Sequence, residues 1–126
     1  MTEAEKNFIR LVRKVPKTKK EISEMDVWLE KFEQELRDEL APLNNELKRL
    51  GVGNDVWDLV NTTETYKEAV PYLIAHLDGD YHKKNIDGIV RSLAVKEATG
   101  LANDVLFALY DKTPNTEFNL KWVIAN

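Results

Sequence analysis

The stretch AVPYLIAHLD, residues 69–78, returns 33 positions later as ANDVLFALYD, residues 102–111. The same offset relates VWDLVN, which begins at Val56, to IVRSLA from Ile89 and to WVIAN from Trp122. A fixed period of this length indicates stacked helical hairpins, each of which buries its apolar face only against a neighbour. The repeat therefore decides the fold class, which we expect to be all-α, and it says little about function.

The repeat also predicts where the helices of the second half lie. We expect one helix pair at 55–61 and 65–78, a second at 83–95 and 99–112, and a last helix that begins near Thr116. Thr65 precedes Glu68 in the spacing of a capping box, which predicts a helix start at that point. Trp57 and Trp122 occupy repeat columns that otherwise hold Val and Ile, so we expect both rings to pack in the core.

The first half shows helix signals without the repeat. Thr2 with Glu5 and Thr18 with Glu21 both fit the capping box, in which a hydroxyl and a carboxylate satisfy backbone N–H groups at a helix start. Pro16 is expected to end the first helix, and Pro42 to break a long second helix, because proline disfavours the helical geometry around it. A short third helix is expected to stop at Gly51.

Composition limits the classes of protein. The chain has 126 residues, a net charge of −4 and no cysteine, which excludes disulfides and thiolate chemistry. Its charged N-terminus does not resemble a secretory signal, and no window is apolar enough to span a membrane, so we expect a cytoplasmic protein without a membrane partner. We expect two parts, an N-terminal helical hairpin over 1–50 and about two and a half repeats over 51–126.

The residues of the repeat carry a resemblance to a known family. The pattern Ala69-Val70-Pro71-x-Leu73-Ile74-x-x-Leu77 resembles the second helix of a HEAT repeat of the short bacterial HEAT-like type, and IVRSLA resembles the first helix. The resemblance covers roughly residues 43–126. It implies a short right-handed α-solenoid whose second helices line a concave, partner-binding face, and relatives that act mainly as scaffolds and adaptors.

The last residues pose a question about the end of that solenoid. Trp122, Val123 and Ile124 are apolar, although end repeats usually present a polar outer face. We expect either that the natural polypeptide continues or that this end packs on the N-terminal helices or on another chain, which would give a homo-oligomer.

Charge is arranged in two adjacent blocks. Residues 6–20 carry seven basic and no acidic side chains, whereas residues 21–46 carry nine acidic side chains and two basic ones. The basic block predicts contacts with a polyanion such as nucleic acid, through Arg10, Arg13, Lys14, Lys17, Lys19 and Lys20. The alternative, which we favour, is that these charges face solvent or pair with the acidic helix.

Other chemistry finds little support in the sequence. His76, Asp78, Asp80 and His82 are suitable metal ligands by type, but Asp-Gly-Asp is an ordinary turn and no i, i+4 histidine pair exists, so we expect no metal. No nucleophile turn, phosphate loop or flanked carboxylate pair is present, so we expect neither catalysis nor a cofactor.

The sequence therefore favours a non-enzymatic module that binds another protein through an acidic helical surface, as an adaptor or inhibitor would. Nucleic-acid binding through residues 6–20 is the alternative function. The candidate partner-binding residues lie on the acidic helix and on the second helices of the repeats: Trp28, Glu33, Glu35, Asp38, Glu39, Tyr72, His76, Asn103 and Asp104.

Overall fold

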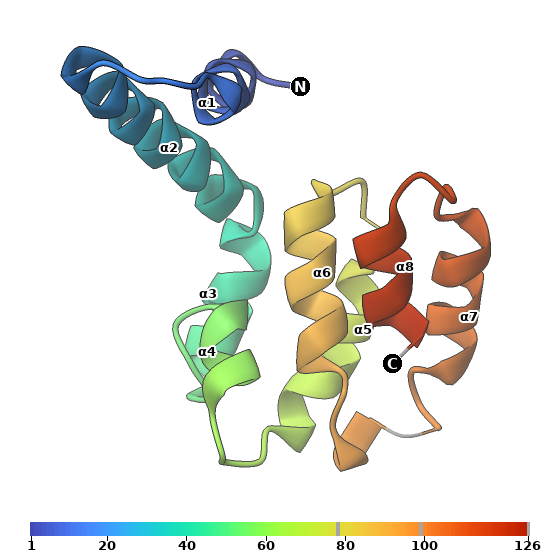
Figure 1. The fold of residues 1–126 in the computed structure, drawn as a ribbon. Helices are drawn as coiled ribbons and strands as arrows, with labels where there is room; N and C mark the ends of the chain where they lie inside the picture. Colours follow the sequence, from blue (N-terminus) through green and yellow to red (C-terminus); the bar gives the residue numbers. More distant parts are fainter. Residues whose placement is uncertain (78, 99, 126) are drawn as a thin grey trace. The chain divides into compact units, whose positions relative to one another are not determined.

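The computed structural model describes residues 1–77, 79–98 and 100–125, and these residues form helices and no strand (Figure 1). The all-α expectation is confirmed. The chain divides into two compact units, Met1–Glu39 and Leu40–Asn126. The sequence suggested a division at residue 50, whereas the structure groups the third helix with the repeats, because its Leu43 and Leu47 are fully buried in their core.

The first unit consists of two antiparallel helices, α1 (Glu3–Arg13) and α2 (Lys19–Glu39). Both expected capping sequences form hydrogen bonds at the starts of these helices. The Thr2 hydroxyl accepts from the N–H of Glu5 at 3.3 Å, and at the second helix Thr18 and Glu21 exchange backbone-to-side-chain bonds, each of 3.1 Å. The helix starts are thus fixed by local chemistry, as predicted.

The second unit begins where Pro42 interrupts the chain. Helix α3 (Ala41–Leu50) starts after Leu40 and carries Pro42 in its first turn, where the missing N–H has no partner to lose. It ends at Gly51, whose φ of 74° is left-handed and favours glycine. Both boundaries agree with the prediction.

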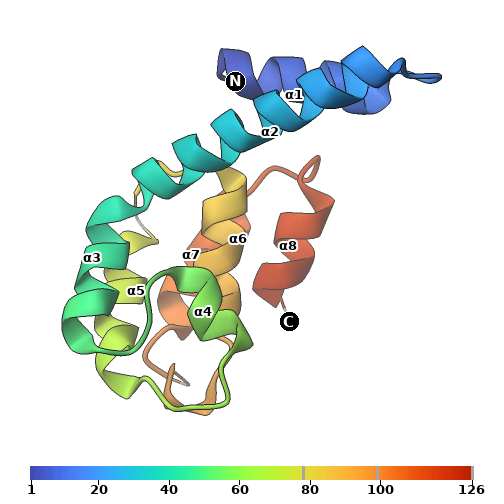
Figure 2. The ribbon, with the colours of Figure 1, turned by 90° about the vertical axis from the view of Figure 1, so that its left-hand side faces the viewer.

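The repeats fold as α4 (Val56–Asn61), η1 (Lys67–Ala69), α5 (Val70–His76), α6 (Lys83–Ser92), η2 (Lys96–Ala98), α7 (Asn103–Lys112) and α8 (Phe118–Ala125). Within this unit α6 packs between α4 and α8, and α3 packs on α5, so that α4, α6 and α8 form one layer (Figures 1 and 2). Helices α3, α5 and α7 form the other. The helix pairs lie where the repeat predicted them.

Two local predictions are wrong. Thr65 does not cap a helix, because the turn η1 begins two residues later with Tyr66 before it and has no side-chain cap. Tyr66 is instead buried, and its hydroxyl donates to the carbonyl of Ser92 at 2.6 Å, which ties the loop before α5 to the end of α6. The hydrogen bond from Tyr66 to Ser92 therefore fixes this segment in place of the predicted cap at Thr65.

The expectation of core tryptophans is also wrong. Trp57 is 43% exposed and Trp122 is 64% exposed. Trp57 lies over Gly88, where a Cβ atom would come within 3.1 Å of the indole ring, so the ring covers the outside of the α4–α6 contact. The repeat columns align residues in sequence, but they do not ensure that each helix turns the same position inward.

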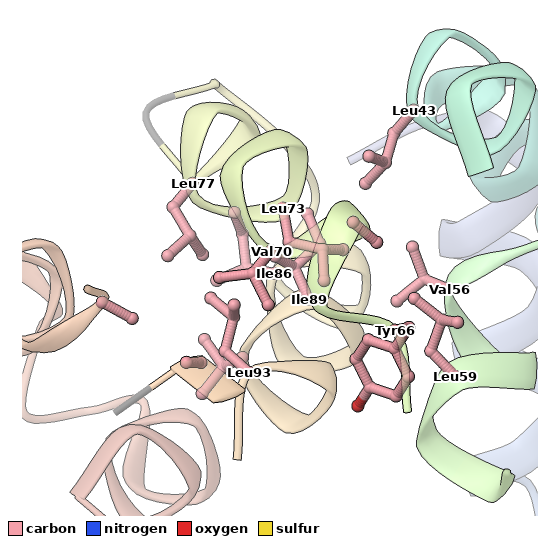
Figure 3. Packing of buried hydrophobic residues seen from close by; sticks show 14 of the residues in the cluster. Leu43, Val56, Leu59, Tyr66, Val70, Leu73, Leu77, Ile86, Ile89 and Leu93 are labelled. Carbon is pink, nitrogen blue, oxygen red and sulfur yellow. The ribbon is translucent and has the colours of Figure 1, made fainter. Parts of the chain in front are cut away.

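The core of this unit joins both layers. Leu73 and Leu77, at the end of α5, point toward Ile86 and Ile89 of α6, and Val56 and Leu59 of α4 lie beside Tyr66 (Figure 3). The first helix pair and the helix that follows it thus share one buried core.

Candidate functional site

One face of α7 carries Asn103, Leu106, Phe107 and Tyr110 and exposes large apolar side chains. These positions have the spacing i, i+3, i+4 and i+7, which places them in one stripe along a helix. Phe107 is 70% exposed and Tyr110 is 38% exposed, whereas Leu106 is half-buried. A contiguous exposed stripe of this kind is typical of an interaction surface.

The stripe forms one wall of a groove. The end of α6 and the turn η2 supply the second wall with Val90, Leu93 and Ala98, and α8 supplies the third with Val123 and Ile124. The groove has a volume of about 590 Å³, and Asn103 and Tyr110 are the side chains with a polar group among the residues that line it. We call it the α7 groove. It is suited to apolar side chains and holds no acid–base or nucleophilic pair.

The edge of the α7 groove carries a cation. The Nζ of Lys121 lies 4.3 Å from the centroid of the Tyr110 ring, a cation–π contact that keeps the ring on the rim. Asn103, one of the predicted partner-binding residues, belongs to the groove. Asp104, its predicted neighbour, is exposed and lines a separate hollow of about 250 Å³ beside Leu77.

The predicted acidic residues of α2 do not all share one face, although the spacing of Glu35, Asp38 and Glu39 places these three together. A helix turns by about 100° per residue, so Glu33 and Glu35 point in nearly opposite directions. Glu35 accepts a hydrogen bond from the Thr2 hydroxyl at 2.9 Å, and Asp38 accepts one from Gln34 at 2.7 Å. Glu39 and Trp28 are half-buried, and Trp28 lies under the ammonium of Lys31 at 4.7 Å.

Tyr72 and His76 share one side of α5, next to α3. The Arg49 guanidinium donates to the Tyr72 hydroxyl at 2.9 Å and to Glu46 at 2.5 Å. These two bonds, that to Glu46 first, raise the pKa of Arg49. Tyr72 is therefore held by the protein's own polar contacts, on a different surface from Asn103.

His76 is also occupied by an internal contact. Its Nδ1 lies 2.6 Å from the hydroxyl of Tyr81, and the two rings stack with centroids 5.9 Å apart. Burial lowers the pKa of His76, and the nearby Glu46 carboxylate opposes that shift in part. The neutral imidazole is thus the preferred form in the folded protein.

The four suggested metal ligands do not form a described site. His82 caps α6, where its Nδ1 accepts from the N–H of Lys84 at 3.0 Å, and His76 contacts Tyr81. Asp78 lies outside the described residues, and within them no three histidine or carboxylate side chains gather closely enough to hold a metal ion.

The basic block is divided between internal contacts and solvent. Lys14 forms an ion pair with Glu21, and that hydrogen bond, together with the N–H of Thr18, lowers the pKa of Glu21 to about 2. The ammonium of Lys17 donates to the carbonyl of Val12 at 3.2 Å, at the end of α1. Arg10, Arg13, Lys19 and Lys20 are exposed, and Arg10 contacts Asn7.

Sequence reasoning missed Leu106, Phe107 and Tyr110. A signal was present in the repeat, because the offset of 33 aligns Val70 with Asn103 at the start of each second helix. Asparagine at a position whose aligned residue, Val70, is buried indicates that this position of α7 is exposed to solvent.

A comparison of the chain with models of protein families, with curated proteins and with solved structures finds no match. The resemblance to HEAT-like repeats therefore rests on the residues of the repeat alone. In the described part of the chain, no helix combines the length and the apolar character that a membrane span requires.

Proposed function

We propose that this protein is a non-enzymatic protein-binding module, in which a short HEAT-like solenoid formed by the second unit holds its partner in the α7 groove. The observation that carries the proposal is the exposure of Phe107 and Tyr110 in an apolar groove of about 590 Å³. Large aromatic side chains are favoured at binding hot spots, where they become buried by the partner.

The partner segment that best suits the α7 groove is an amphipathic helix. The stripe of α7 repeats at helical spacing, and a helix laid along it would offer apolar side chains at matching intervals. A helix satisfies the backbone hydrogen bonds of its central residues internally, which suits a groove that offers few polar side chains, Asn103 and Tyr110.

Solenoid character is supported by the period of 33 residues and by the two layers of helices in the second unit. In such arrays the second helices of successive repeats share one surface, and partners bind along it. The groove lies against α7, which is a second helix in this scheme.

The test is a tagged capture from cell lysate with three forms of the protein. The wild type is compared with Phe107→Ser/Tyr110→Ser, and a control, Val15→Ser/Val27→Ser, removes two exposed apolar side chains from the first unit. Each lysate is divided into nuclease-treated and untreated halves, and captured proteins are quantified by mass spectrometry.

We expect a discrete protein that the wild type and the control retain equally, that survives nuclease treatment, and that the groove variant loses. Equal capture by the groove variant would overturn the assignment of the site. Capture that disappears with nuclease would favour nucleic-acid binding through the basic residues of α1 and the following loop.

A further inference from the structure

The first unit has an apolar face of its own. In α1, Phe8 and Leu11 point toward α2, where the ring of Phe8 lies 6.4 Å from that of Phe32. Beside this contact, on one side of the helix pair, lies a row of further apolar side chains, which we call the hairpin face: Ile9, Val12, Ile22, Met25 and Leu29. Val12 and Ile22 are each 45% exposed, and the other three are half-buried.

The other side of the same helix pair carries mainly polar side chains, with two apolar ones among them. It contains a shallow hollow lined by Asn7, Arg10, Ser23 and Glu24, together with Val27 and Trp28. The helical repeat of about 3.6 residues places Ile9 and Val12 away from Asn7 and Arg10 on α1. The two sides of the unit are therefore chemically distinct, and the apolar side is the hairpin face.

The first unit buries few apolar side chains by itself. It has 39 residues, and its fully or nearly buried apolar side chains are Ala4, Leu11 and Phe32. Domains below about 40 residues usually need disulfides, a metal or association with another body. The chain has no cysteine, and its described residues hold no metal-binding cluster.

Opposite charges border the hairpin face. On α1, Lys6 and Arg13 flank Ile9 at spacings of three and four residues, so the three form one row. On α2, Asp26 and Glu33 follow Ile22 and Leu29 by four residues each and form the corresponding row. One edge of the face is thus basic, and the other is acidic in its middle part, between Lys19 and Arg37, which lie at the two ends of the same row.

We propose that the hairpin face binds the hairpin face of a second copy of this chain, so that two first units form an antiparallel four-helix bundle. A two-fold axis parallel to the helices places α1 of one copy over α2 of the other. The basic edge of each copy then lies along the acidic edge of its partner. This charge complementarity selects a second copy as the occupant of the face.

The pairing also has a register. Within one unit Thr2 bonds to Glu35 and Lys14 pairs with Glu21, which fixes the heights of the two helices. Because an axis parallel to the helices causes no shift along them, Lys6 comes within about one helical turn of Glu33 of the second copy. Arg13 comes within about one turn of Asp26 in the same way. An axis across the helices would instead place α1 over α1 and bring like charges together.

The experiment uses the full chain and measures its mass in solution by sedimentation equilibrium over a range of concentrations. The variant Lys6→Glu/Arg13→Glu reverses the basic edge, and Asp26→Lys/Glu33→Lys reverses the acidic edge. The matched control is Arg10→Glu/Lys20→Glu, which makes the same change in net charge on the polar side. Circular dichroism checks that each variant keeps its helix content.

We expect a dimer for the wild type and the control. Each edge variant should raise the dissociation constant at least about tenfold, because like charges then face each other. An equimolar mixture of the two edge variants should form a heterodimer, which a variant that had merely unfolded could not do.

A monomeric wild type would overturn the proposal, and so would a dimer that neither edge variant weakens. The groove variant Phe107→Ser/Tyr110→Ser should remain dimeric. If it alone dissociates, the copies associate through the α7 groove instead. Failure of the dimer proposal leaves the groove proposal intact, because the two concern different units.

Discussion

Helices α5 and α7, whose sequences the period of 33 residues aligns, differ in how far their apolar positions are covered. Val70 and Leu73 of α5 and the following Leu77 are buried, whereas the aligned residues Asn103, Leu106 and Tyr110 of α7 line the α7 groove. The same sequence period thus gives one closed interface and one open one. On the proposal made above, the open interface keeps the helical scaffold and leaves a surface for a partner.

The replacements that open the second interface are few. A buried valine becomes asparagine, and the fully buried Leu77 becomes the exposed Tyr110 with its cation–π contact to Lys121. An asparagine that has no room for its hydrogen-bond partners in a core is tolerated at a groove edge. The polar groups of Asn103 and Tyr110 therefore suit a solvent-exposed groove edge better than a buried core.

The largest expected difference between the two interfaces concerns Leu73 and Leu106. Leu73→Ala should lower the free energy of unfolding by about 2–5 kcal/mol, because a fully buried leucine leaves a cavity. Leu106→Ala should cost about 1 kcal/mol, because a half-buried side chain beside a groove leaves little closed cavity. Urea unfolding followed by circular dichroism measures both, and equal losses would contradict the comparison.

The next prediction concerns Ile74 and Phe107, which the repeat also aligns. Phe107→Ala removes the larger side chain, yet it should change the free energy of unfolding by no more than about 0.5 kcal/mol, because the ring is 70% exposed. Ile74→Ala should cost about 1 kcal/mol, since Ile74 packs against the core. A larger loss of unfolding free energy for Phe107→Ala would mean that this ring stabilises the fold and is not an exposed contact for a partner.

Parts of this arrangement could be predicted from sequence and parts could not. Local bonds at Thr18 and Gly51 and the breaks before Pro16 and Pro42 follow from short-range chemistry. The helix pairs follow from the period. The predicted helix cap at Thr65 was wrong because Tyr66 forms a hydrogen bond to the carbonyl of Ser92, 26 residues away. No local sequence pattern contains such a contact.

The α7 groove could not be predicted for a related reason. It requires α6, α7 and α8 in space, and the exposure of Trp122 shows that α8 presents a different face from the one its alignment with Ile89 suggests. Asn103 was found, together with Asp104, because both are polar positions on a second helix. Phe107 and Tyr110 look like core residues until the neighbouring helices are placed.

The smallest expected effect is a pH dependence of stability that arises at His76, which the period aligns with the apolar Leu109 of α7. Burial lowers the pKa of His76, so the unfolded chain takes up a proton first as the pH falls below the ordinary value of 6.5. The stabilisation is full above that pH and is lost as the pH falls toward the lower pKa of the folded state.

The variant His76→Leu should therefore lose less thermal stability than the wild type between about pH 7.5 and pH 5.5, because this imidazole no longer titrates. Thermal unfolding at both pH values, compared as a difference between variant and wild type, removes the contribution of the carboxylates. An unchanged difference would show that the His76–Tyr81 contact tolerates a charged ring.

The most direct test of the account places a photoreactive benzoylphenylalanine at position 107 in one form of the protein and at position 57 in another. Both positions are exposed aromatic sites of the second unit, but Trp57 lies outside the α7 groove. After irradiation in cell lysate, the account predicts a discrete crosslinked protein from position 107 that position 57 does not yield and that nuclease does not remove. The same crosslinks from both positions, or none from position 107, would contradict the claim that the open repeat is a protein-binding site.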